Sequence, residues 1–497
     1  MANKACNEVV TVANMPMTVF DMISAMQNKY ADRVAFRYVE GKDTVVEKTY
    51  AQYVQDIRKA TGYLQQELGE PKGKKIVILS RTNYEYGAVV FGTMMAGAVI
   101  VTLNQGKTWA ELEYELGMVE PDLIFNDGID YGYRAQLEAL YGARLRPMDA
   151  WTAAPEAEMV NRIDHEGLLM LMFTSGTTGR SKGVMLSEKN FFSVMRAHTQ
   201  IGEHMMAYKH EPDIVMSQYT VLPMFHLGAF ICLFSWAHAG WALNVSSDIR
   251  SFYKEVKRMP SQAMAVVPVI MNSLHHDVMR GRKDRLGELW VPICSSAMFD
   301  PQVMLDMAEH GMFVVQTYGS TETCGDGIIN YAQDAKHIGA VGQGNDYLDY
   351  KIAEDGELCM RGDSIMLGYY KDPEATAEVL DADGWFHTGD LARVDEDGFY
   401  YITGRKKNII ILDNGENVSP EELENLLSKC EAVKECIVRE KGKKICAVIY
   451  CGEADQQTVR DFITETNRTL PLYKRMSAVE FSTEPLPRTG TGKLLRK

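Results

Sequence analysis

Short apolar runs alternate with longer helix-like segments between Lys75 and Phe125. Lys75–Leu79, Ala98–Thr102 and Leu123–Phe125 are apolar runs of strand length, and the segments between them have the spacing of helices. Strands that are apolar along their whole length are typical of a parallel sheet with helical crossovers on its faces. This part of the chain is therefore restricted to an α/β fold around a largely parallel, buried sheet.

The same alternation resumes further along the chain and then changes twice. Four more apolar strand runs lie between residues 214 and 316, whereas short strands dense in Gly and Asp follow from Gly339, and a new strand and helix pattern follows Lys407. We predict an N-terminal domain over 1–406, with α/β lobes at 1–165 and 166–338 and a β subdomain at 339–406. A small, mobile α+β domain is expected at 407–497.

Composition excludes several classes of partner. The 497-residue chain carries a formal charge of −15, which argues against nonspecific binding to nucleic acid or anionic membranes. Its nine cysteines form no Cys-x2-Cys pair, as expected for reduced thiols, and no export signal is apparent. Leu227–Val245 is apolar but is interrupted by His238, two glycines and Asn244, so we expect a buried helix and a strand, not a membrane span. A cytoplasmic protein is predicted.

The stretch Thr174–Gly183, Thr-Ser-Gly-Thr-Thr-Gly-Arg-Ser-Lys-Gly, follows an apolar strand run. Glycines let the backbone approach an anion closely, hydroxyls and bare N–H groups donate hydrogen bonds, and Lys182 adds a positive charge. The spacing differs from that of a P-loop, and a plain surface loop has a similar composition. The residues favour a phosphate-binding loop of another kind.

Four further motifs carry groups that suit a nucleotide. Tyr318-Gly-Ser-Thr-Glu322 ends a strand run and offers an aromatic ring, hydroxyls and a carboxylate able to bind Mg²⁺. Thr388-Gly-Asp390 offers a carboxylate just after a turn, and Gly404-Arg405 a guanidinium; each could hydrogen-bond to a sugar, or be an ordinary turn or a solvated end. Pro487–Lys493 is a glycine-rich segment with a lysine, which could equally be a disordered tail.

With these five motifs in this order, the sequence resembles the adenylate-forming superfamily of acyl-CoA synthetases, firefly-type luciferases and nonribosomal-peptide adenylation domains. The resemblance covers essentially the whole chain. It implies that a carboxylic acid reacts with ATP to give an acyl adenylate and pyrophosphate, and that a thiol then takes the acyl group. It also implies ATP, Mg²⁺ and CoA as the cofactors, and a C-terminal domain that rotates between the two half-reactions.

The resemblance assigns a role to each motif residue. Lys493 would bridge the substrate carboxylate and the α-phosphate, Thr321 would contact the α-phosphate, and Glu322 would bind Mg²⁺. Tyr318 would stack on adenine, Asp390 and Arg405 would hold the ribose, and Lys407 falls at the hinge position. The β- and γ-phosphates would be gripped by Thr174, Ser175, Gly176, Thr177, Thr178, Gly179 and Lys182. Ser296 and Ala297 stand where the family has a glycine-rich, adenine-facing segment, and Gly415 lies in the loop that shapes the thiol tunnel.

The substrate pocket is expected around His226, Leu227 and Gly319. Amino-acid-activating members of the family carry an aspartate at the position of His226, so the residue here argues against an amino acid. Apolar neighbours such as Phe230 and Trp236 suit a fatty or aromatic acid, unless they are only core. We predict an acid–thiol ligase that uses CoA. Loading of an acyl carrier protein in trans is the alternative, a non-catalytic ligand-binding relative is a third reading, and the oligomeric state is left open.

Overall fold

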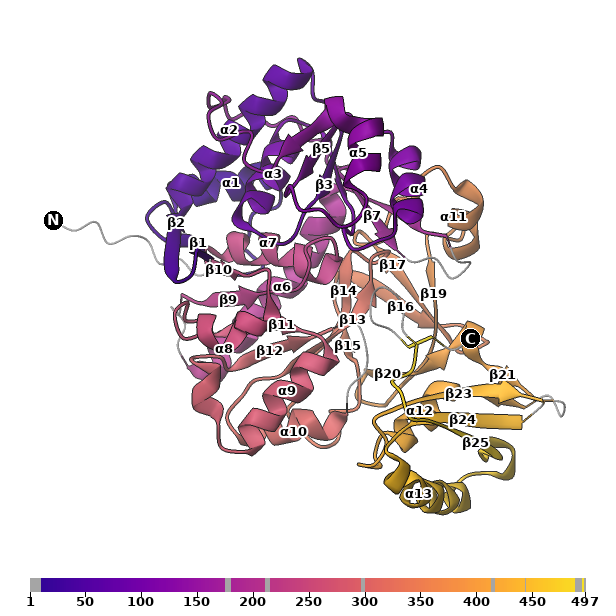
Figure 1. Ribbon diagram of the computed structural model, residues 1–497. Helices are drawn as coiled ribbons and strands as arrows, with labels where there is room; N and C mark the ends of the chain where they lie inside the picture. Colours follow the sequence, from indigo (N-terminus) through magenta and orange to yellow (C-terminus); the bar gives the residue numbers. More distant parts are fainter. Residues whose placement is uncertain are drawn as a thin grey trace. The chain divides into compact units, whose positions relative to one another are not determined.

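A computed structural model of the protein describes residues 10–174, 180–210, 215–295, 300–412, 416–442, 444–487 and 494–495, except for the side chains at 326 and 417 (Figure 1). The chain divides into two compact units. The first comprises Met1–Asp349 and Arg361–Trp385, and the second comprises Tyr350–Met360 and Phe386–Lys497. The predicted domain boundary at residue 407 stays a prediction.

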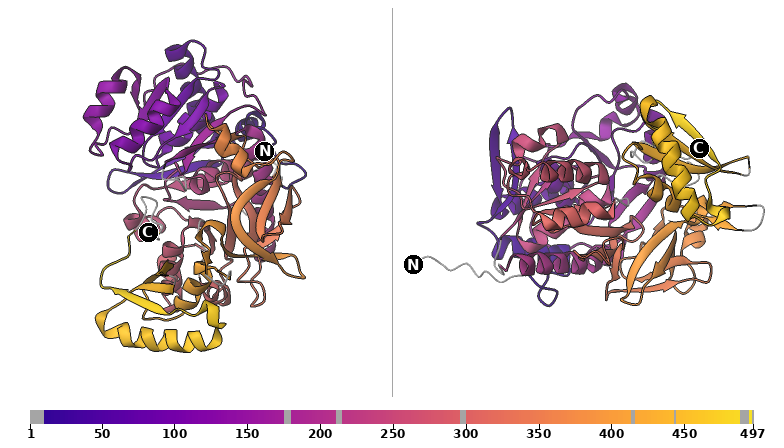
Figure 2. Two further views of the ribbon diagram at one scale, coloured as in Figure 1. Left: turned by 90° about the vertical axis from the view of Figure 1, so that its right-hand side faces the viewer. Right: turned by 90° about the horizontal axis from the view of Figure 1, so that it is seen from below.

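The first unit contains a seven-stranded sheet in the order β18-β8-β7-β4-β3-β5-β6. Its central strands are parallel, and Ile76, Val77 and Ile78 at its centre are completely buried, as the apolar runs predict. Helices lie on both sides of these strands (Figures 1 and 2). The strands are β3 (Lys75–Leu79), β4 (Val99–Thr102), β5 (Leu123–Asn126), β6 (Leu145–Pro147), β7 (Met170–Thr174), β8 (Lys182–Leu186) and β18 (Gly368–Tyr369). The helices are α2 (Tyr50–Leu68), α3 (Tyr84–Met95), α4 (Trp109–Val119), α5 (Arg134–Tyr141) and α11 (Pro373–Val379).

A second run of strands in the first unit has the order β15-β14-β13-β12-β11-β9-β10-β1-β2. Six neighbouring strands of this run are parallel to one another, in the order β13, β12, β11, β9, β10 and β1. Strands β2, β14 and β15 pair antiparallel with their neighbours. The strands are β1 (Val34–Glu40), β2 (Thr44–Thr49), β9 (Ser217–Thr220), β10 (Ala242–Val245), β11 (Ala263–Val266), β12 (Val291–Cys294), β13 (Val315–Ser320), β14 (Gly325–Asn330) and β15 (Gly342–Gly344). The helices are α1 (Val19–Asn28), α6 (Glu188–Lys209), α7 (Leu227–Ala239), α8 (Phe252–Glu255), α9 (Pro268–Met279) and α10 (Pro301–Glu309).

The apolar segment Leu227–Val245 folds as predicted from its polar interruptions. It forms α7, which Gly240 ends in a left-handed conformation (φ +68°), and then β10. Along the part of the chain that the structure describes, no helix has both the length and the apolar character needed to cross a membrane.

The second unit is built from short strands and two helices. Strands β17, β19 and β20 are antiparallel, and a three-stranded sheet of β23, β24 and β25 follows, with α12 and α13 packed around a core that includes Leu423, Ile449 and Ile463. Strand β16 (Leu348–Ile352) crosses from the first unit into the second. The remaining elements are β17 (Glu357–Gly362), β19 (Phe386–Val394), β20 (Phe399–Arg405), β21 (Ile410–Ile411), β22 (Asn417–Val418), α12 (Pro420–Leu427), β23 (Glu435–Lys441), β24 (Lys444–Tyr450), α13 (Gln456–Thr469) and β25 (Ala478–Ser482).

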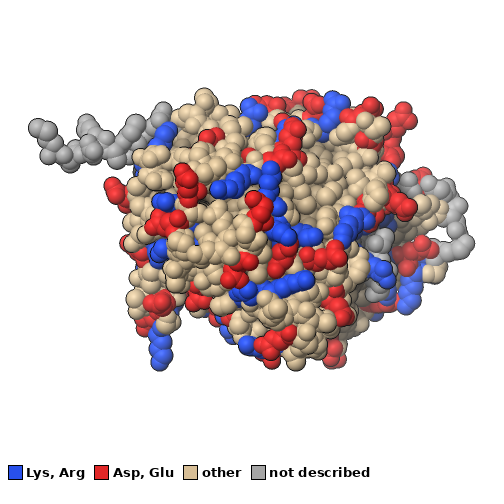
Figure 3. Space-filling view, turned by 90° about the horizontal axis from the view of Figure 1, so that it is seen from above, with Lys and Arg blue, Asp and Glu red and all other residues tan. Residues whose placement is uncertain are grey.

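On the face shown in Figure 3, Lys and Arg side chains lie among Asp and Glu side chains. Ion pairs in the first unit bring opposite charges together, such as Arg58 with Glu156 at 2.8 Å and Arg134 with Glu138 at 2.7 Å. Charges of the two signs are thus interspersed on this face.

Candidate active site

The predicted phosphate loop connects the two strands of a β-hairpin. Strands β7 and β8 are antiparallel, and Thr174 at the end of β7 is the register partner of Lys182 at the start of β8. The sequence pattern predicted the strand before the loop but not the strand after it. Just before Lys182, Ser181 Oγ accepts from Lys107 Nζ at 3.3 Å, and Lys107 also pairs with the fully buried Glu115. The hairpin fixes where the Lys182 side chain begins.

Tyr369, which belongs to none of the sequence motifs, connects Lys182 with the predicted magnesium ligand. It lies on β18, which pairs with β8, and its ring centroid is 4.8 Å from Lys182 Nζ. Its hydroxyl donates to Glu322 Oε1 at 2.9 Å. Burial, and then the neighbouring Glu322 carboxylate, raise the pKa of Tyr369, so the hydroxyl stays protonated and remains a donor.

The motif Tyr318–Glu322 straddles the end of β13. The strand continues to Ser320, beyond the predicted end, so Tyr318 is a strand residue and Thr321 and Glu322 lie in the turn that follows. Only glycine fits at position 319, because a Cβ there would overlap the carbonyl oxygen of Gly325. Among the described residues, only Tyr369 hydrogen-bonds to the Glu322 carboxylate. A half-buried carboxylate with one oxygen engaged suits a Mg²⁺ ligand, since Mg²⁺ needs few protein oxygens when phosphates supply the rest.

The two residues predicted to hold the ribose lie side by side in the second unit. Asp390 and Arg405 are register partners on β19 and β20, and Arg405 Nε lies 2.5 Å from Asp390 Oδ1. The Asp390 carboxylate is buried, while the Arg405 side chain is 44% exposed. The expectation that Thr388–Asp390 follows a turn is wrong, because the motif lies inside β19, where Gly389 has a positive φ of 71° and the pairing slips at Leu391. Their role in ribose binding stays a prediction.

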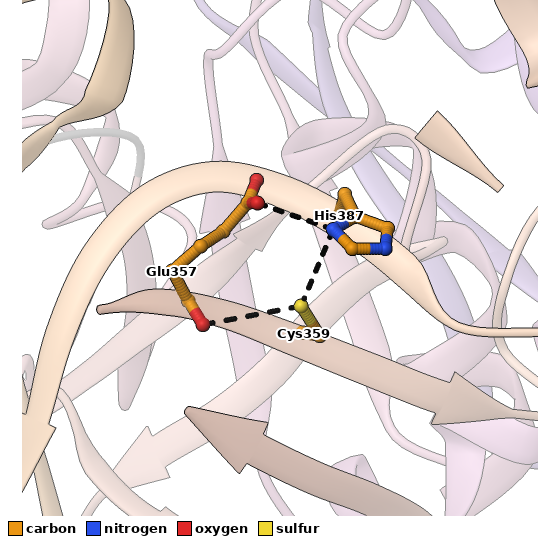
Figure 4. A group of neighbouring side chains, drawn as sticks. All are labelled: Glu357, Cys359 and His387. Carbon is orange, nitrogen blue, oxygen red and sulfur yellow. Dashed lines mark hydrogen bonds and ion pairs between the residues drawn. The ribbon is translucent and has the colours of Figure 1, made fainter. Parts of the chain in front are cut away.

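Glu357 fastens this strand segment from β17 (Figure 4). Its Oε1 accepts the backbone N–H of Gly389 at 2.8 Å, and its Oε2 accepts from His387 Nδ1 at 3.1 Å and from Lys406 Nζ at 3.0 Å. Lys406 also pairs with Asp355 at 2.6 Å. Burial opposes ionisation of Glu357, but the hydrogen bonds from Lys406 and His387 outweigh it and lower the pKa of Glu357.

Glu357, His387 and Cys359 also have the donor atoms of a metal site. Cys359 Sγ lies 3.5 Å from His387 Nδ1, and the three ligand atoms lie within 4.8 Å of one another. However, the Glu357 oxygen that faces His387 already accepts from the Lys406 ammonium. A divalent cation on that oxygen would be repelled by a neighbouring positive charge. We therefore interpret the group as a hydrogen-bonded network that braces the 387–390 segment.

A cavity in the first unit lies between α6, α7 and the strands, but it does not include the residues predicted for the substrate pocket. His226 is exposed at the N-terminal end of α7, Leu227 is the first residue of that helix, and Gly319 is exposed on β13. The cavity begins one residue later, at Gly228. Its lining residues are His198, Ile201, Gly202, Met205, Gln218, Gly228, Ile231, Cys232, Ser235, Trp236, Trp241, Ala265, Ile293, Ser295 and Thr317.

Several predicted site residues lie outside the described residues. They are Ser175, Gly176, Thr177, Thr178, Gly179, Ser296, Ala297, Gly415 and Lys493. Lys407 is described, in the short helical turn that follows β20, and its role as a hinge stays a prediction.

Two parts of the chain match models of known protein families. Residues 24–370 match the model of the AMP-binding enzyme family, and residues 422–493 match the AMP-binding enzyme C-terminal domain. The chain belongs to the AMP-binding enzyme family. It is an acyl-CoA synthetase, an adenylate-forming acid–thiol ligase, and the predicted α/β fold with a smaller C-terminal domain is confirmed.

Two relatives illustrate the range of the family. A long-chain-fatty-acid–CoA ligase of Salmonella typhimurium is 28% identical, with 97% of this chain and 93% of the relative covered. A feruloyl-CoA synthase of an Amycolatopsis species is 29% identical, with 90% and 92% covered. Among solved structures, o-succinylbenzoate CoA synthetase of Bacillus subtilis in complex with its acyl-adenylate intermediate has a TM-score of 0.81 at 23% identity, with 96% of each chain covered. At that identity the likeness concerns the fold.

Proposed function

We propose that this acyl-CoA synthetase activates an apolar acid, fatty or aromatic, and transfers the acyl group to CoA itself. The observation that carries the proposal is the line of contacts from Lys182 through Tyr369 to Glu322. It joins a lysine at the base of a hydroxyl-rich loop to a carboxylate that can bind Mg²⁺, as a site for a polyphosphate requires. The relatives named for long-chain fatty acids and for ferulate support both kinds of acid.

In the first half-reaction, an oxygen of the substrate carboxylate forms a bond to the α-phosphorus, and the bond to pyrophosphate breaks. Two anions must approach, so the site has to neutralise charge and hold the partners in line. Lys182 would lie against the leaving phosphates, and Lys493 would bridge the carboxylate and the α-phosphate. Mg²⁺ bound through Glu322 would supply further positive charge to the phosphate oxygens. Tyr369 would hold the Glu322 carboxylate in place.

In the second half-reaction the reacting centre is the acyl carbon of the adenylate, and the thiol of CoA, which gives up its proton, is the acceptor. The sulfur of CoA forms a bond to the acyl carbon, and the bond to AMP breaks. The nucleotide would stay bound during this step through Asp390 and Arg405. Rotation at Lys407 would withdraw Lys493 and bring the Gly415 loop to the thiol.

Acid-dependent exchange of labelled pyrophosphate into ATP tests the first half-reaction with a panel of fatty and aromatic acids. CoA and a phosphopantetheinylated acyl carrier protein are then compared as acceptors. Thioester formation with CoA at the higher kcat/KM is the expected result. Faster loading of the carrier protein would assign the chain to carrier loading, and no exchange with any acid would overturn the proposal.

A further inference from the structure

Glu322 is bound at two points by one stretch of chain, residues 363–370, which leads into β18 and includes it. The Glu322 main-chain carbonyl accepts the Met366 N–H at 2.8 Å, and the side-chain Oε1 accepts the Tyr369 hydroxyl at 2.9 Å. Met366 and Tyr369 are both buried. One bond fixes the backbone and the other fixes the carboxylate, so the direction of the Glu322 side chain depends on where this segment lies.

The same segment is hydrogen-bonded to β8, the strand that begins at Lys182. The Leu367 N–H donates to the Met185 carbonyl at 2.9 Å, and the Tyr370 N–H donates to the Gly183 carbonyl at 2.7 Å. The segment 363–370 therefore bridges the strand that carries the lysine and the turn that carries the carboxylate. Whatever holds this segment in place acts on the spacing between those two groups.

Asn190, in the first turn of α6, fastens the start of the segment. Its Nδ2 donates to the carbonyl oxygens of Asp363 at 2.8 Å and Ile365 at 2.9 Å. Its Oδ1 accepts the Ser187 N–H at 2.7 Å, which completes the capping box of α6. Carbonyl oxygens only accept and the N–H only donates, so this buried position requires two donors and one acceptor, which a primary amide supplies.

A second contact between α6 and the segment is weaker. Lys189 pairs with Asp363 at 3.0 Å, but the two side chains are 37% and 63% exposed, so the pair contributes little. The hydrogen bond from Asn190 to the Ile365 carbonyl is buried instead. Loss of a buried hydrogen bond costs more than loss of a solvent-exposed ion pair, because the group left behind has no water to replace its partner. Asn190 is therefore the stronger attachment of the two.

We infer that Asn190 is a positioning residue for Glu322. By holding residues 363–365, it keeps Met366 and Tyr369 where they bond to Glu322, and it acts through the segment without taking part in the chemical step. The inference rests on the proposed function, in which Glu322 binds Mg²⁺. It adds to that function a residue on another helix that belongs to none of the sequence motifs.

Hydrogen exchange of the purified full-length protein, measured by mass spectrometry without ATP or Mg²⁺, tests the attachment. Asn190→Asp keeps the size of the side chain and the acceptor for the helix cap, but it places an oxygen against two carbonyl oxygens. We expect the amides of 366–370 to exchange about tenfold faster than in the wild type. Asn190→Ala, which removes the donors without adding a charge, takes its place if the charged variant does not fold.

Ser187→Ala is the matched control. It removes the Oγ that accepts the Asn190 N–H at 3.2 Å and so weakens the same helix cap, but it leaves both Nδ2 bonds in place. Exchange of 366–370 should then be that of the wild type. Unchanged exchange in the Asn190 variant would overturn the inference, and so would equal acceleration in both variants, since the cap alone would then explain it.

The Mg²⁺ requirement of pyrophosphate exchange tests the link to Glu322. Asn190→Asp should raise the Mg²⁺ concentration for half-maximal exchange by about fivefold, less than Tyr369→Phe because it acts one step further away, and Ser187→Ala should leave it unchanged. In the Tyr369→Phe background the factor should be smaller, since one of the two bonds is already gone. An unchanged requirement, or the same factor in both backgrounds, would overturn the inference. Absence of exchange by the wild type with every acid would instead overturn the proposed function.

Discussion

Glu357→Gln tests whether the carboxylate on β17 braces the segment that carries Asp390. The amide keeps the shape of the side chain, and its oxygen can still accept the Gly389 N–H. It carries no negative charge, so the interactions with Lys406 and with His387 are weakened. Hydrogen bonds to charged groups contribute about 1.5–3 kcal/mol each when buried. Lys406 and His387 side chains are 49% and 33% exposed, so solvent screening reduces the loss to about 1 kcal/mol each, or about 2 kcal/mol in total.

Hydrogen exchange followed by mass spectrometry measures this loss locally. Of the six tryptophans, Trp385 adjoins this segment, but its fluorescence cannot resolve single residues as amide exchange can. A loss of about 2 kcal/mol should speed exchange of the 386–390 amides by about thirtyfold where exchange follows local opening. Glu354→Gln, at an exposed carboxylate three residues earlier, is the control and should exchange like the wild type.

The effect should depend on pH with a definite sign. The pKa of Glu357 in the folded protein is below its ordinary value of 4.5, so its contribution to stability is fully present above pH 4.5. That contribution disappears as the pH falls through the lowered pKa, because the wild-type carboxyl group is then protonated as well. Equal protection of 386–390 in wild type and variant at pH 7 would refute the bracing role.

Three further substitutions probe the proposed chemistry. Tyr369→Phe removes the hydroxyl that holds Glu322 and should raise the Mg²⁺ concentration needed for half-maximal pyrophosphate exchange by about tenfold; an unchanged Mg²⁺ dependence would contradict that role. Lys493→Ala should slow acyl-adenylate formation about a hundredfold while sparing thioester formation from supplied acyl adenylate, and equal losses in both would remove its assignment. Lys407→Pro should stiffen the proposed hinge, so that adenylation continues and thioester formation fails; normal turnover would argue against rotation there.

The sequence predicted well those features that depend on local patterns. Apolar runs located the buried parallel strands, and polar interruptions in Leu227–Val245 correctly favoured a helix and a strand over a membrane span. The resemblance assigned Asp390 and Arg405 to one task; the structure shows them as register partners on two strands, while the task itself stays a prediction. Such predictions succeed because periodicity and motif order are written in consecutive residues.

Features that depend on distant contacts could not be predicted. Tyr369 lies 47 residues from Glu322 and on a two-residue strand, so no periodicity marks it. The hairpin that places Lys182 opposite Thr174 and the strand through Thr388–Asp390 both contain glycines that are also typical of loops. Glu357 is one acidic residue in a Gly- and Asp-rich region, and only the fold shows that its carboxylate is buried among three donors.

The second unit places a specific constraint on the proposed rotation at Lys407. Just before that residue, β20 lies so close to the start of α12 that a Cβ at Gly404 would overlap Ser419 Oγ. Just after it, Asn408 donates to Glu421 at 2.6 Å, so the chain beyond the pivot is fastened to the same helix. Lys406 is instead paired with Glu357 on β17 and with Asp355 in the turn before that strand. Rotation at Lys407 could leave these two sets of polar contacts intact, but the close approach of Gly404 and Ser419 would have to separate.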